Sequence, residues 1–417
     1  MNNGRKILIL FLIGLICSGS YCSREKVIAK IVLENDNHKR YDAPVSIFLN
    51  DLDINTNIKL LEIREGLKKE IPVQIDKSEN KLYCILSGIT EIGEIRIFEL
   101  WPDSENETDD LIANTNKNGI LLKWKDKKLV QYQSVPADLQ DGVDSVYTRG
   151  GFIHPLKTLS GRTLTRIQPD DHYHHVGIWN PWTKTTFQGR EVDFWNLAKK
   201  QGTVRFKNSE SLQSGNVFTG FNVNHEHIEI NAPEGESAVM NEKWKVKVYQ
   251  PGTNSYYTVD FTSVLECATD SSIALNQYRY GGGIGFRATE LWNRENCNVL
   301  TSEGKTRIDA DATHAKWCKV FGNIDNSTSG ILFLCHPDNF EFPQPMRIWP
   351  EDANNGKGDM FFQFCPIRHK DWYLVANEKY SQQYRMIVYD GEIAMEQAEK
   401  LWQDYANPPK IFIHKEK

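Results

Sequence analysis

The sequence predicts an all-β, mainly antiparallel protein: a small N-terminal β-sandwich, a large β-sandwich or supersandwich-like domain, and one C-terminal helix. Short apolar runs that alternate with polar residues and end at turn residues recur along the chain, as in strands with one buried face. The 417 residues include 11 Trp, 16 Tyr and 19 Phe, and aromatic residues favour strands. Apolar residues at three- and four-residue steps, typical of a helix, are clear only over residues 392–405.

Residues 1–23 have the features of an export signal. Arg5 and Lys6 precede a short apolar run that is followed by small residues, which is the order of a secretory signal. The apolar run is too short to span a bilayer, which needs about 20 residues. We expect an exported protein, in the periplasm or attached to the outer membrane. Cys17 or Cys22 could carry a lipid anchor after cleavage, and this would be the protein's only link to a membrane.

Six cysteines follow the signal, widely spaced and without a C-x-x-C pair. An even number in an exported protein permits disulfides. Several of them, however, lie in apolar strand-like runs such as residues 332–335, where a cysteine acts as a small apolar side chain. We therefore expect buried free thiols rather than disulfides at Cys84, Cys267, Cys297, Cys318, Cys335 and Cys365.

Residues 24–102 are expected to form the small β-sandwich, because short strand-like runs bounded by turn residues follow one another closely there. The five runs are residues 27–33, 45–49, 58–63, 81–86 and 95–100. The next segment, residues 103–119, is acidic and polar without apolar periodicity. It is expected to be a linker between domains.

Residues 120–417 are expected to form the large β-rich, catalytic domain. A hairpin is predicted over residues 244–249 and 256–265, because turn residues separate them and apolar residues alternate with lysines in the first run. The helix at residues 392–405 is expected to stop before Pro408 and Pro409. The chain has 49 basic and 55 acidic side chains and a net charge of −6, so no nucleic-acid partner is expected.

The densest group of titratable residues is the run from Asp170 to His175, with two Asp and three His. On an extended chain His172 and His174 would share one face, and His175 would point the other way. Imidazoles exchange protons near neutral pH, bind metals and hold hydroxyl groups. The alternative is a polar loop with one imidazole bonded to the backbone. We predict that this run is the functional centre, with His172 and His174 as catalytic residues, His174 the more sensitive, and His175 as a substrate-binding residue.

Glu191 and Asp193 are the predicted carboxylate partners. Their spacing would place both on one face of a strand, where repulsion between them can keep one protonated and able to act as a general acid. The alternative is a solvated strand edge with Arg190 as ion-pair partner. His225 and His227 repeat the same spacing and rank below the first histidine run.

Arginines beside aromatic rings mark candidate substrate-binding residues, because a guanidinium is a planar fork for hydroxyls or carboxylates and a ring is an apolar platform. Two arginines lie on either side of four glycines, three of them consecutive, which allow a bend or a close approach. No helix pattern follows, so this is not a dinucleotide site. The predicted substrate-binding residues here are Arg279, Arg287, His336, Arg347 and Trp349.

Four separated runs resemble a bacterial family commonly labelled the PmoA family, or methane oxygenase, and otherwise a domain of unknown function. They are residues 150–156, 171–179, 283–289 and 345–350, and the resemblance covers about residues 120–405. Similar chains accompany polysaccharide-degradation systems, so the resemblance implies work on glycans. It implies no catalytic residues.

Three functions remain open. The leading prediction is a carbohydrate-active enzyme, a hydrolase or a lyase, that cleaves an oligo- or polysaccharide by His/carboxylate acid–base chemistry. It would need no metal or other cofactor. The second is a glycan-binding protein without catalysis. The third is a metal-dependent oxygenase, in which His172, His174 and Glu191 would be the ligands.

Overall fold

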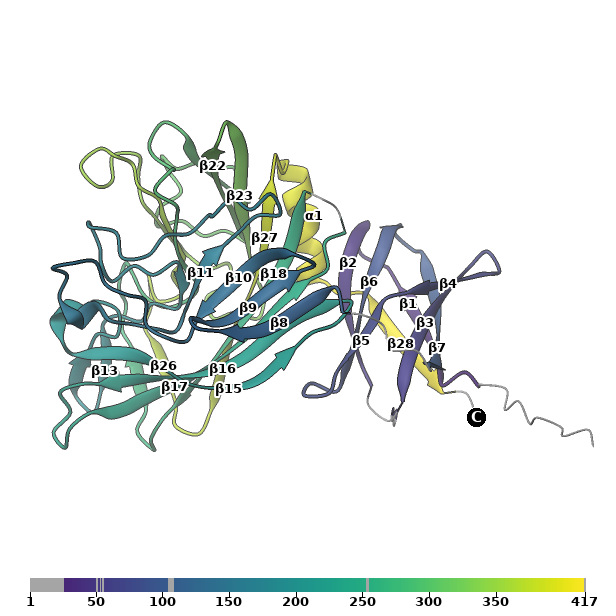
Figure 1. The fold of residues 1–417 in the computed structure, drawn as a ribbon, viewed down its shortest axis with the longest axis horizontal. Helices are drawn as coiled ribbons and strands as arrows, with labels where there is room; N and C mark the ends of the chain where they lie inside the picture. The colour runs from purple at the N-terminus through teal and green to yellow at the C-terminus, as the bar shows by residue number, and fades with distance from the viewer. Residues whose placement is uncertain are drawn as a thin grey trace, which may run out of the picture.

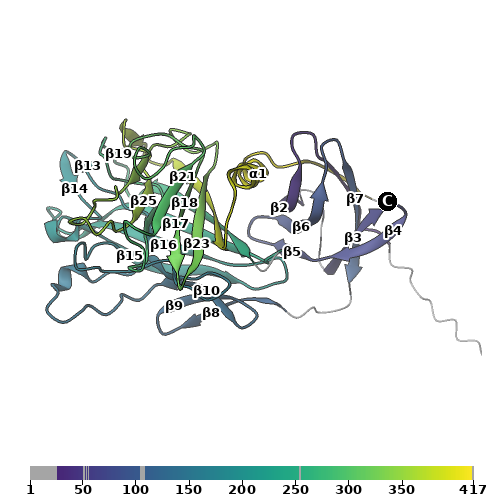
Figure 2. The ribbon, with the colours of Figure 1, turned by 90° about the horizontal axis from the view of Figure 1, so that it is seen from above.

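The computed structural model describes residues 26–49, 52, 54, 56–103, 109–252 and 255–415. Antiparallel sheets account for nearly all of its regular structure, and the described part contains one α-helix, so the all-β prediction is confirmed. A large and a small β-rich part lie side by side (Figures 1 and 2). None of the helices described is long and apolar enough to cross a membrane. The predicted signal, with Cys17 and Cys22, lies outside the described residues.

Two sheets form the small sandwich. The five-stranded sheet has the order β28 (Lys410–Lys415), β1 (Ala29–Glu34), β7 (Ile95–Asp103), β3 (Asn57–Arg64) and β4 (Leu67–Ile71). The three-stranded sheet has the order β2 (Arg40–Phe48), β6 (Lys81–Thr90) and β5 (Val73–Asp76). All five strand-like runs of this region form strands. Strand β4 was not predicted, because its first four residues are all exposed and give no alternation.

The predicted extent of the large domain, residues 120–417, is wrong at its C-terminal end, because strand β28 belongs to the small sandwich. Strand β28 pairs with β1 along its whole length, from Ala29 opposite Lys415 to Glu34 opposite Lys410. Ile411 and Ile413 pack against the core of the small sandwich, and in Figure 1 this strand lies among those of the N-terminal part. Residues 410–415 therefore complete the N-terminal sandwich.

The predicted linker, residues 103–119, also contains regular structure. Asp103 ends β7, and β8 (Leu111–Asn116) is the outermost strand of a sheet of the large part. Only Leu111 of β8 is fully buried. An edge strand with most of its side chains in solvent can be polar throughout, which is why composition alone indicated a loop.

Two eight-stranded sheets form the body of the large part. The first has the order β24 (Met346–Ile348), β25 (Phe361–Phe364), β20 (Gly285–Arg287), β12 (Ile178–Trp179), β11 (Phe152–Leu156), β10 (Lys127–Gln133), β9 (Gly119–Trp124) and β8. The second has the order β15 (Gly202–Gln213), β16 (Phe218–Glu229), β17 (Ser237–Tyr249), β18 (Tyr256–Cys267), β27 (Lys379–Asp390), β23 (Ser327–Cys335), β22 (Trp317–Ile324) and β21 (Cys297–Thr301).

One apolar core joins the two large sheets. Phe286 of the first sheet contacts Phe333 of the second, with ring centroids 5.5 Å apart. The predicted hairpin is β17–β18, and its apolar residues Trp244 and Val246 enter this core. A four-stranded sheet with its own core lies beside them, in the order β14 (Arg190–Val192), β13 (Thr185–Phe187), β19 (Ile273–Leu275) and β26 (Trp372–Leu374).

The predicted helix is α1 (Met395–Ala406), which lies between the two parts (Figure 2). Its apolar side packs against the second large sheet, with Ala398 fully buried. Asp404 faces the small sandwich and accepts hydrogen bonds from His38 and Arg40. Two single turns of 3-10 helix occur at Ser145–Tyr147 and Leu197–Lys199.

A lysine of β17 makes the second link between the two parts. Lys247 Nζ lies 2.9 Å from Asp76 Oδ2 and 2.6 Å from Glu79 Oε2, and it donates to Tyr83 Oη. The alternation of apolar residues with lysines in residues 244–249 predicts a solvent-facing side for this lysine, but the small sandwich covers it and Lys247 is buried. The six cysteines of the described chain are free and buried, as predicted.

Candidate functional site

The histidine run lies between β11 and β12 and is a chain of turns, not a strand. The His172 amide donates to the Pro169 carbonyl, and the His175 amide donates to the His172 carbonyl. The predicted separation of His175 from the other two rings is therefore wrong. All three imidazoles gather, with ring centroids 5.4 Å apart for His172 and His174, 4.7 Å for His172 and His175, and 4.8 Å for His174 and His175.

The three rings line a small cavity of about 200 Å³, here named the histidine cavity. Its wall is built from segments that are far apart in sequence, and most of its side chains are aromatic. The lining residues are His172, His174, His175, Trp195, Asn196, Tyr278, Arg279, Tyr280 and Trp349.

Asp171 anchors His172. Its Oδ2 accepts a hydrogen bond from His172 Nδ1 at 2.7 Å, and both its oxygens accept from Arg287 Nη2 at 2.8–2.9 Å. Burial alone would raise the pKa of Asp171, but the hydrogen bond from His172 and the charge of Arg287 bring it well below its usual value. Asp171 is thus a carboxylate at neutral pH. It keeps the proton of His172 on Nδ1 and leaves Nε2 as a proton acceptor.

Arg287 lies beneath the cavity as a buried cation. It is fully buried, and its Nη2 also donates to Asp359 at 2.8 Å. Asp359 accepts a further bond from Arg166. The guanidinium of Arg287 lies 4.7 Å from the ring centroid of Trp349. Two arginines and two aspartates therefore balance one another under the cavity floor.

His174 and His175 are held neutral. Burial, and next the charge of His172, lowers the pKa of His174 to about 4. Burial, and next His174 and Arg287, lowers the pKa of His175 well below its usual value. His175 Nδ1 accepts a long 3.4 Å hydrogen bond from Arg287, which places its ring proton on Nε2. At neutral pH the cavity therefore offers imidazoles that can accept or share a proton.

Aromatic rings form the remaining wall. Trp195 stacks on His175 with ring centroids 5.4 Å apart, and Trp349 contacts His172 at 4.9 Å. Tyr280 contacts Trp195 at 5.3 Å. Its hydroxyl accepts hydrogen bonds from Arg347 at 3.0 Å and from Trp349 Nε1 at 3.2 Å. Since two donors already point at this oxygen, its own O–H is left to donate elsewhere.

The glycine run fixes the position of Tyr280. Gly282 and Gly283 have φ of +71° and +62°, a region that favours glycine. A Cβ at Gly282 would collide with the ring of Trp182, and one at Gly283 with the carbonyl of Phe364. The close approach expected of these glycines is thus observed, and it holds the segment before β20 against the first large sheet.

The predicted carboxylate pair does not form. Glu191 is exposed on β14, whereas Asp193 follows the strand and is almost completely buried. Asp193 accepts hydrogen bonds from the backbone amides of Trp195 and Asn196 at 3.0 and 2.8 Å, and it pairs with Lys199. The expectation of a shared strand face is wrong because the chain turns at Asp193. Its carboxylate instead shapes the loop that carries Trp195 into the cavity.

The predicted substrate-binding residues divide into three groups. His175, Arg279 and Trp349 line the cavity. Arg287 and Arg347 lie behind the wall and donate hydrogen bonds to His175 and Tyr280, which form it. His336 lies elsewhere, against Tyr405 of α1 with ring centroids 5.1 Å apart.

Several lining residues were not predicted: Trp195, Asn196, Tyr278 and Tyr280. Asp171 lies within the predicted run, but its anchoring role was not predicted. The two tyrosines flank Arg279 directly, and Trp195 follows Asp193 by two residues. The sequence carried a signal only through these neighbours. A single aromatic residue in a β-rich chain is otherwise indistinguishable from core.

A second, larger cavity of about 1270 Å³ is lined by Asp170 and Asp171, the first residues of the histidine run, and shares Asp171 and Asp359 with the charged floor. Its lining includes Arg162, Arg166 and Lys357 but no Trp, Tyr or Phe. It therefore has no ring platform for a sugar. We refer to it as the polar cavity.

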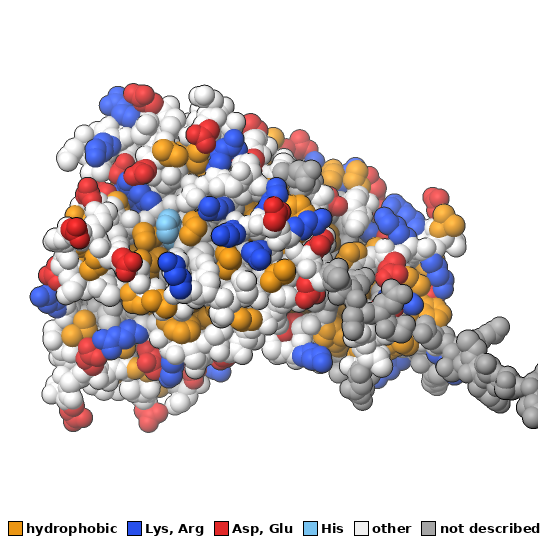
Figure 3. Space-filling model, viewed as in Figure 1, with side chains coloured by type: hydrophobic (Ala, Val, Ile, Leu, Met, Phe, Trp, Pro, Cys, Tyr) orange, Lys and Arg blue, Asp and Glu red, His pale blue; other side chains and the backbone are white. Residues whose placement is uncertain are grey.

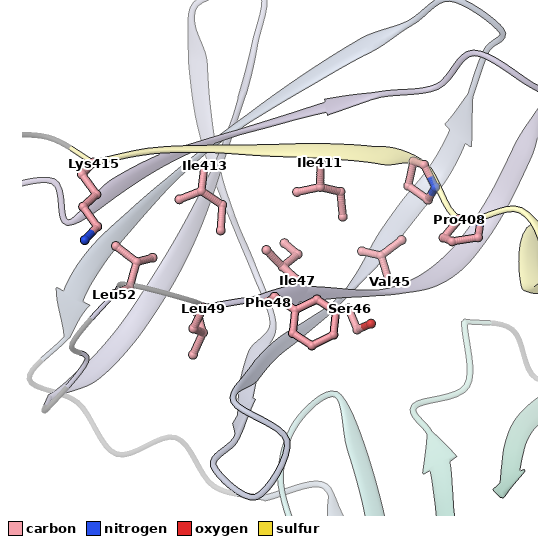
Figure 4. A pocket seen from close by; sticks show the side chains of 11 residues that line it. Val45, Ser46, Ile47, Phe48, Leu49, Leu52, Pro408, Ile411, Ile413 and Lys415 are labelled. Atoms are coloured by element: carbon pink, nitrogen blue, oxygen red, sulfur yellow. The ribbon is translucent and has the colours of Figure 1, made fainter. Parts of the chain in front are cut away.

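The second histidine pair is structural, and a separate groove in the small sandwich is almost free of titratable groups. His225 and His227 are buried and hydrogen-bonded to Tyr132 at 2.6 Å and Glu242 at 2.8 Å, inside the core. An apolar groove lies between the two sheets of the small sandwich, where Val45 and Ile47 face Ile411 and Ile413 across the open edge (Figure 4). It has no titratable side chain apart from Lys415.

Within the described residues, no three His, Cys, Asp or Glu side chains are placed so that they could hold a metal ion. The oxygenase ligand set of His172, His174 and Glu191 is not assembled, because Glu191 is exposed on β14 and does not line the cavity. On the face shown in Figure 3, acidic and basic side chains are interspersed.

Residues 120–403 match a protein family described as a family of unknown function (DUF6807). No curated protein sequence matches the chain. Among solved structures, it is similar to heparan sulfate lyase HepC from Pedobacter heparinus, at 10% identity and a TM-score of 0.32 over 70% of this chain and 38% of that one. It is also similar to a heparinase III, at 10% identity and 0.30 over 69% and 37%. The chain spans well under two thirds of each of these two structures.

A third similar structure is the GH36 alpha-galactosidase AgaB from Geobacillus stearothermophilus, at 8% identity and a TM-score of 0.28 over 69% of this chain and 40% of that one. The methane-oxygenase label and the polysaccharide context implied by the sequence resemblance remain predictions.

Proposed function

Because the chain belongs to the DUF6807 family, whose function is unknown, we propose a function from the histidine cavity itself: a carbohydrate-active enzyme that cleaves glycosidic bonds by histidine acid–base chemistry. The observation that carries the proposal is the hydrogen bond between His172 and Asp171 at the edge of a ring-lined cavity. A positioned imidazole with a free Nε2 is a general base, and aromatic walls suit the apolar faces of sugar rings.

The chemistry differs from that of a glycosidase with two catalytic carboxylates. Asp171 is held by Arg287 and Asp193 by backbone amides and Lys199. Neither carboxylate lines the histidine cavity. Proton transfer therefore falls to the imidazoles, with His172 as the base and the neutral His174 beside it. The exported location predicted from residues 1–23, with or without a lipid anchor, is part of this proposal.

The experiment is a screen of the purified protein against neutral and acidic glycans, followed by His172→Ala and His174→Ala. Each substitution should lower turnover about 10²- to 10⁴-fold, the usual effect of removing a general acid or base, while the melting temperature changes little. His414→Ala is the matched control, because His414 is exposed on β28, in the other domain.

Unchanged turnover in both variants would contradict the proposal. If the wild-type protein binds a glycan but cleaves none, the alternative of a non-catalytic glycan-binding protein is correct, since the aromatic wall would suffice for binding. Loss of folding in His174→Ala alone would make that residue structural and leave the decision to His172→Ala.

A further inference from the structure

We infer that the histidine cavity binds an acidic sugar, a hexuronate, and that its glycosidic bond breaks by β-elimination; this rests on the function proposed above. The first observation is the charge of the cavity wall. The whole chain carries −6, yet Arg347 and Arg368 behind the wall share one carboxylate, Asp311, at 3.0 and 2.9 Å. One negative charge for two guanidinium groups leaves this side of the cavity positive.

Arg279 adds a third cation, on the cavity lining itself. It is exposed, and its guanidinium lies 5.4 Å from the ring centroid of Tyr280. Among the residues that the structure describes, no carboxylate forms an ion pair with Arg279. Its planar fork is therefore available for a bidentate contact with a carboxylate of the ligand. The tyrosine ring contacts the guanidinium without neutralising its charge.

The titratable groups of the cavity match elimination better than hydrolysis. Hydrolysis of a glycoside commonly uses two carboxylic groups, and the lining of this cavity has none. Elimination needs a base near C5 of a uronate, a cation on its carboxylate and a proton donor for the leaving oxygen. His172, Arg279 and Tyr280 supply these three groups.

The step balances without water or a cofactor. Nε2 of His172 takes the proton from C5, and the electron pair of that C–H bond becomes the C4–C5 double bond. The C4–O bond breaks with its electron pair, and the leaving oxygen takes the proton of the Tyr280 hydroxyl. That phenol loses its proton next to Arg347, which already donates to its oxygen. Arg279 stabilises the charge that spreads into the carboxylate.

A sulfate ester would satisfy the charge of Arg279 equally well, but it would not acidify the proton at C5. The two anions are therefore separated by the choice of probe. Polygalacturonate and alginate carry carboxylates without sulfate, their carboxyl-reduced forms are neutral, and dextran sulfate carries sulfate without carboxylate.

The test measures binding of these four kinds of polymer by titration calorimetry and cleavage by the ultraviolet absorbance of the new double bond. The wild-type protein should bind and cleave at least one polyuronate but not its reduced form. Arg279→Gln should weaken that binding about 10- to 100-fold, as expected for loss of a hydrogen-bonded charge. Arg64→Gln is the matched control, an exposed arginine of the small sandwich.

Equal binding of a polyuronate and its reduced form, or unchanged binding in Arg279→Gln, would overturn the inference. Binding of dextran sulfate together with no cleavage of either polyuronate would also overturn it. If a neutral glycan is cleaved and His172→Ala abolishes this, the inference fails while the proposed function stands. If the protein binds no glycan, both fail.

Discussion

Asp171 Oδ2 and His172 Nδ1 lie 2.7 Å apart, although the two residues are adjacent in the chain. Neighbouring side chains in a strand point to opposite faces, so this contact exists only because residues 169–175 form turns. The same carboxylate binds the buried Arg287. The turn therefore joins an accessible imidazole to a fixed charge inside the domain.

Asp171→Asn should lower turnover more than it weakens glycan binding. The amide cannot supply the negative charge that orients His172 and balances Arg287, so we expect a loss of about 10²-fold or more in kcat and about 1–3 kcal/mol of stability. Kinetics and urea unfolding of the same preparation measure both. A variant with full kcat would show that the contact is only structural.

Acid should destabilise the protein between pH 6.5 and 4, in part through His174. Burial, and next the charge of His172, lowers its folded pKa to about 4, from an ordinary value of 6.5. The unfolded chain therefore binds more protons in this window, so the contribution of His174 is complete above pH 6.5 and is lost as the pH falls towards 4. The loss amounts to at most about 3 kcal/mol.

The measurement is the free energy of unfolding by urea at several pH values. His174→Ala should reduce the change in the free energy of unfolding between pH 6.5 and 4. His414→Ala, at an exposed position of β28, should leave this pH dependence unchanged. Equal slopes in wild type and His174→Ala would contradict the prediction.

Lys247→Met should uncouple the unfolding of the two domains. Asp76 and Glu79 would lose the ammonium group that lies 2.9 and 2.6 Å from them. Asp76 is almost fully buried and would lose its ion pair with Lys247, and breaking a buried ion pair costs about 3–5 kcal/mol. Glu79 would keep its contact with Lys245. Calorimetry should then resolve two unfolding transitions. Lys245→Met is the control. Lys245 is more exposed than Lys247 and lies 3.2 Å from Glu79, and an exposed ion pair contributes at most about 1 kcal/mol to the free energy of unfolding.

Truncation after Pro409 should destabilise the small sandwich selectively. It removes β28 and leaves β1 as an unpaired edge, which favours aggregation. We expect a lower first unfolding temperature and aggregation on heating, while the large domain keeps its β-rich circular dichroism spectrum. A chain ending at Lys415 keeps β28 and is the control. Identical melting curves for the two truncations would show that β28 contributes nothing.

The sequence alone was sufficient for the elements whose information is local. Strand alternation predicted the hairpin β17–β18, and apolar spacing predicted α1 to within three residues at its start. The run of titratable residues between Asp170 and His175 pointed to the loop that lines the cavity. These features depend on the periodicity and composition of short segments, and both can be read directly from the sequence.

Tertiary structure decided which distant residues meet. His175 contacts both Trp195 and Trp349, and Trp349 lies more than 150 residues further along the chain. Asp193 supports a loop and does not line the cavity, and β28 pairs with the first strand of the chain. No local pattern encodes these pairings, because each depends on how complete sheets stack and on which buried charges find partners. The chemistry of the site follows from that packing: the same packing leaves His174 neutral, and among the described residues it gives Arg279 no carboxylate as an ion-pair partner.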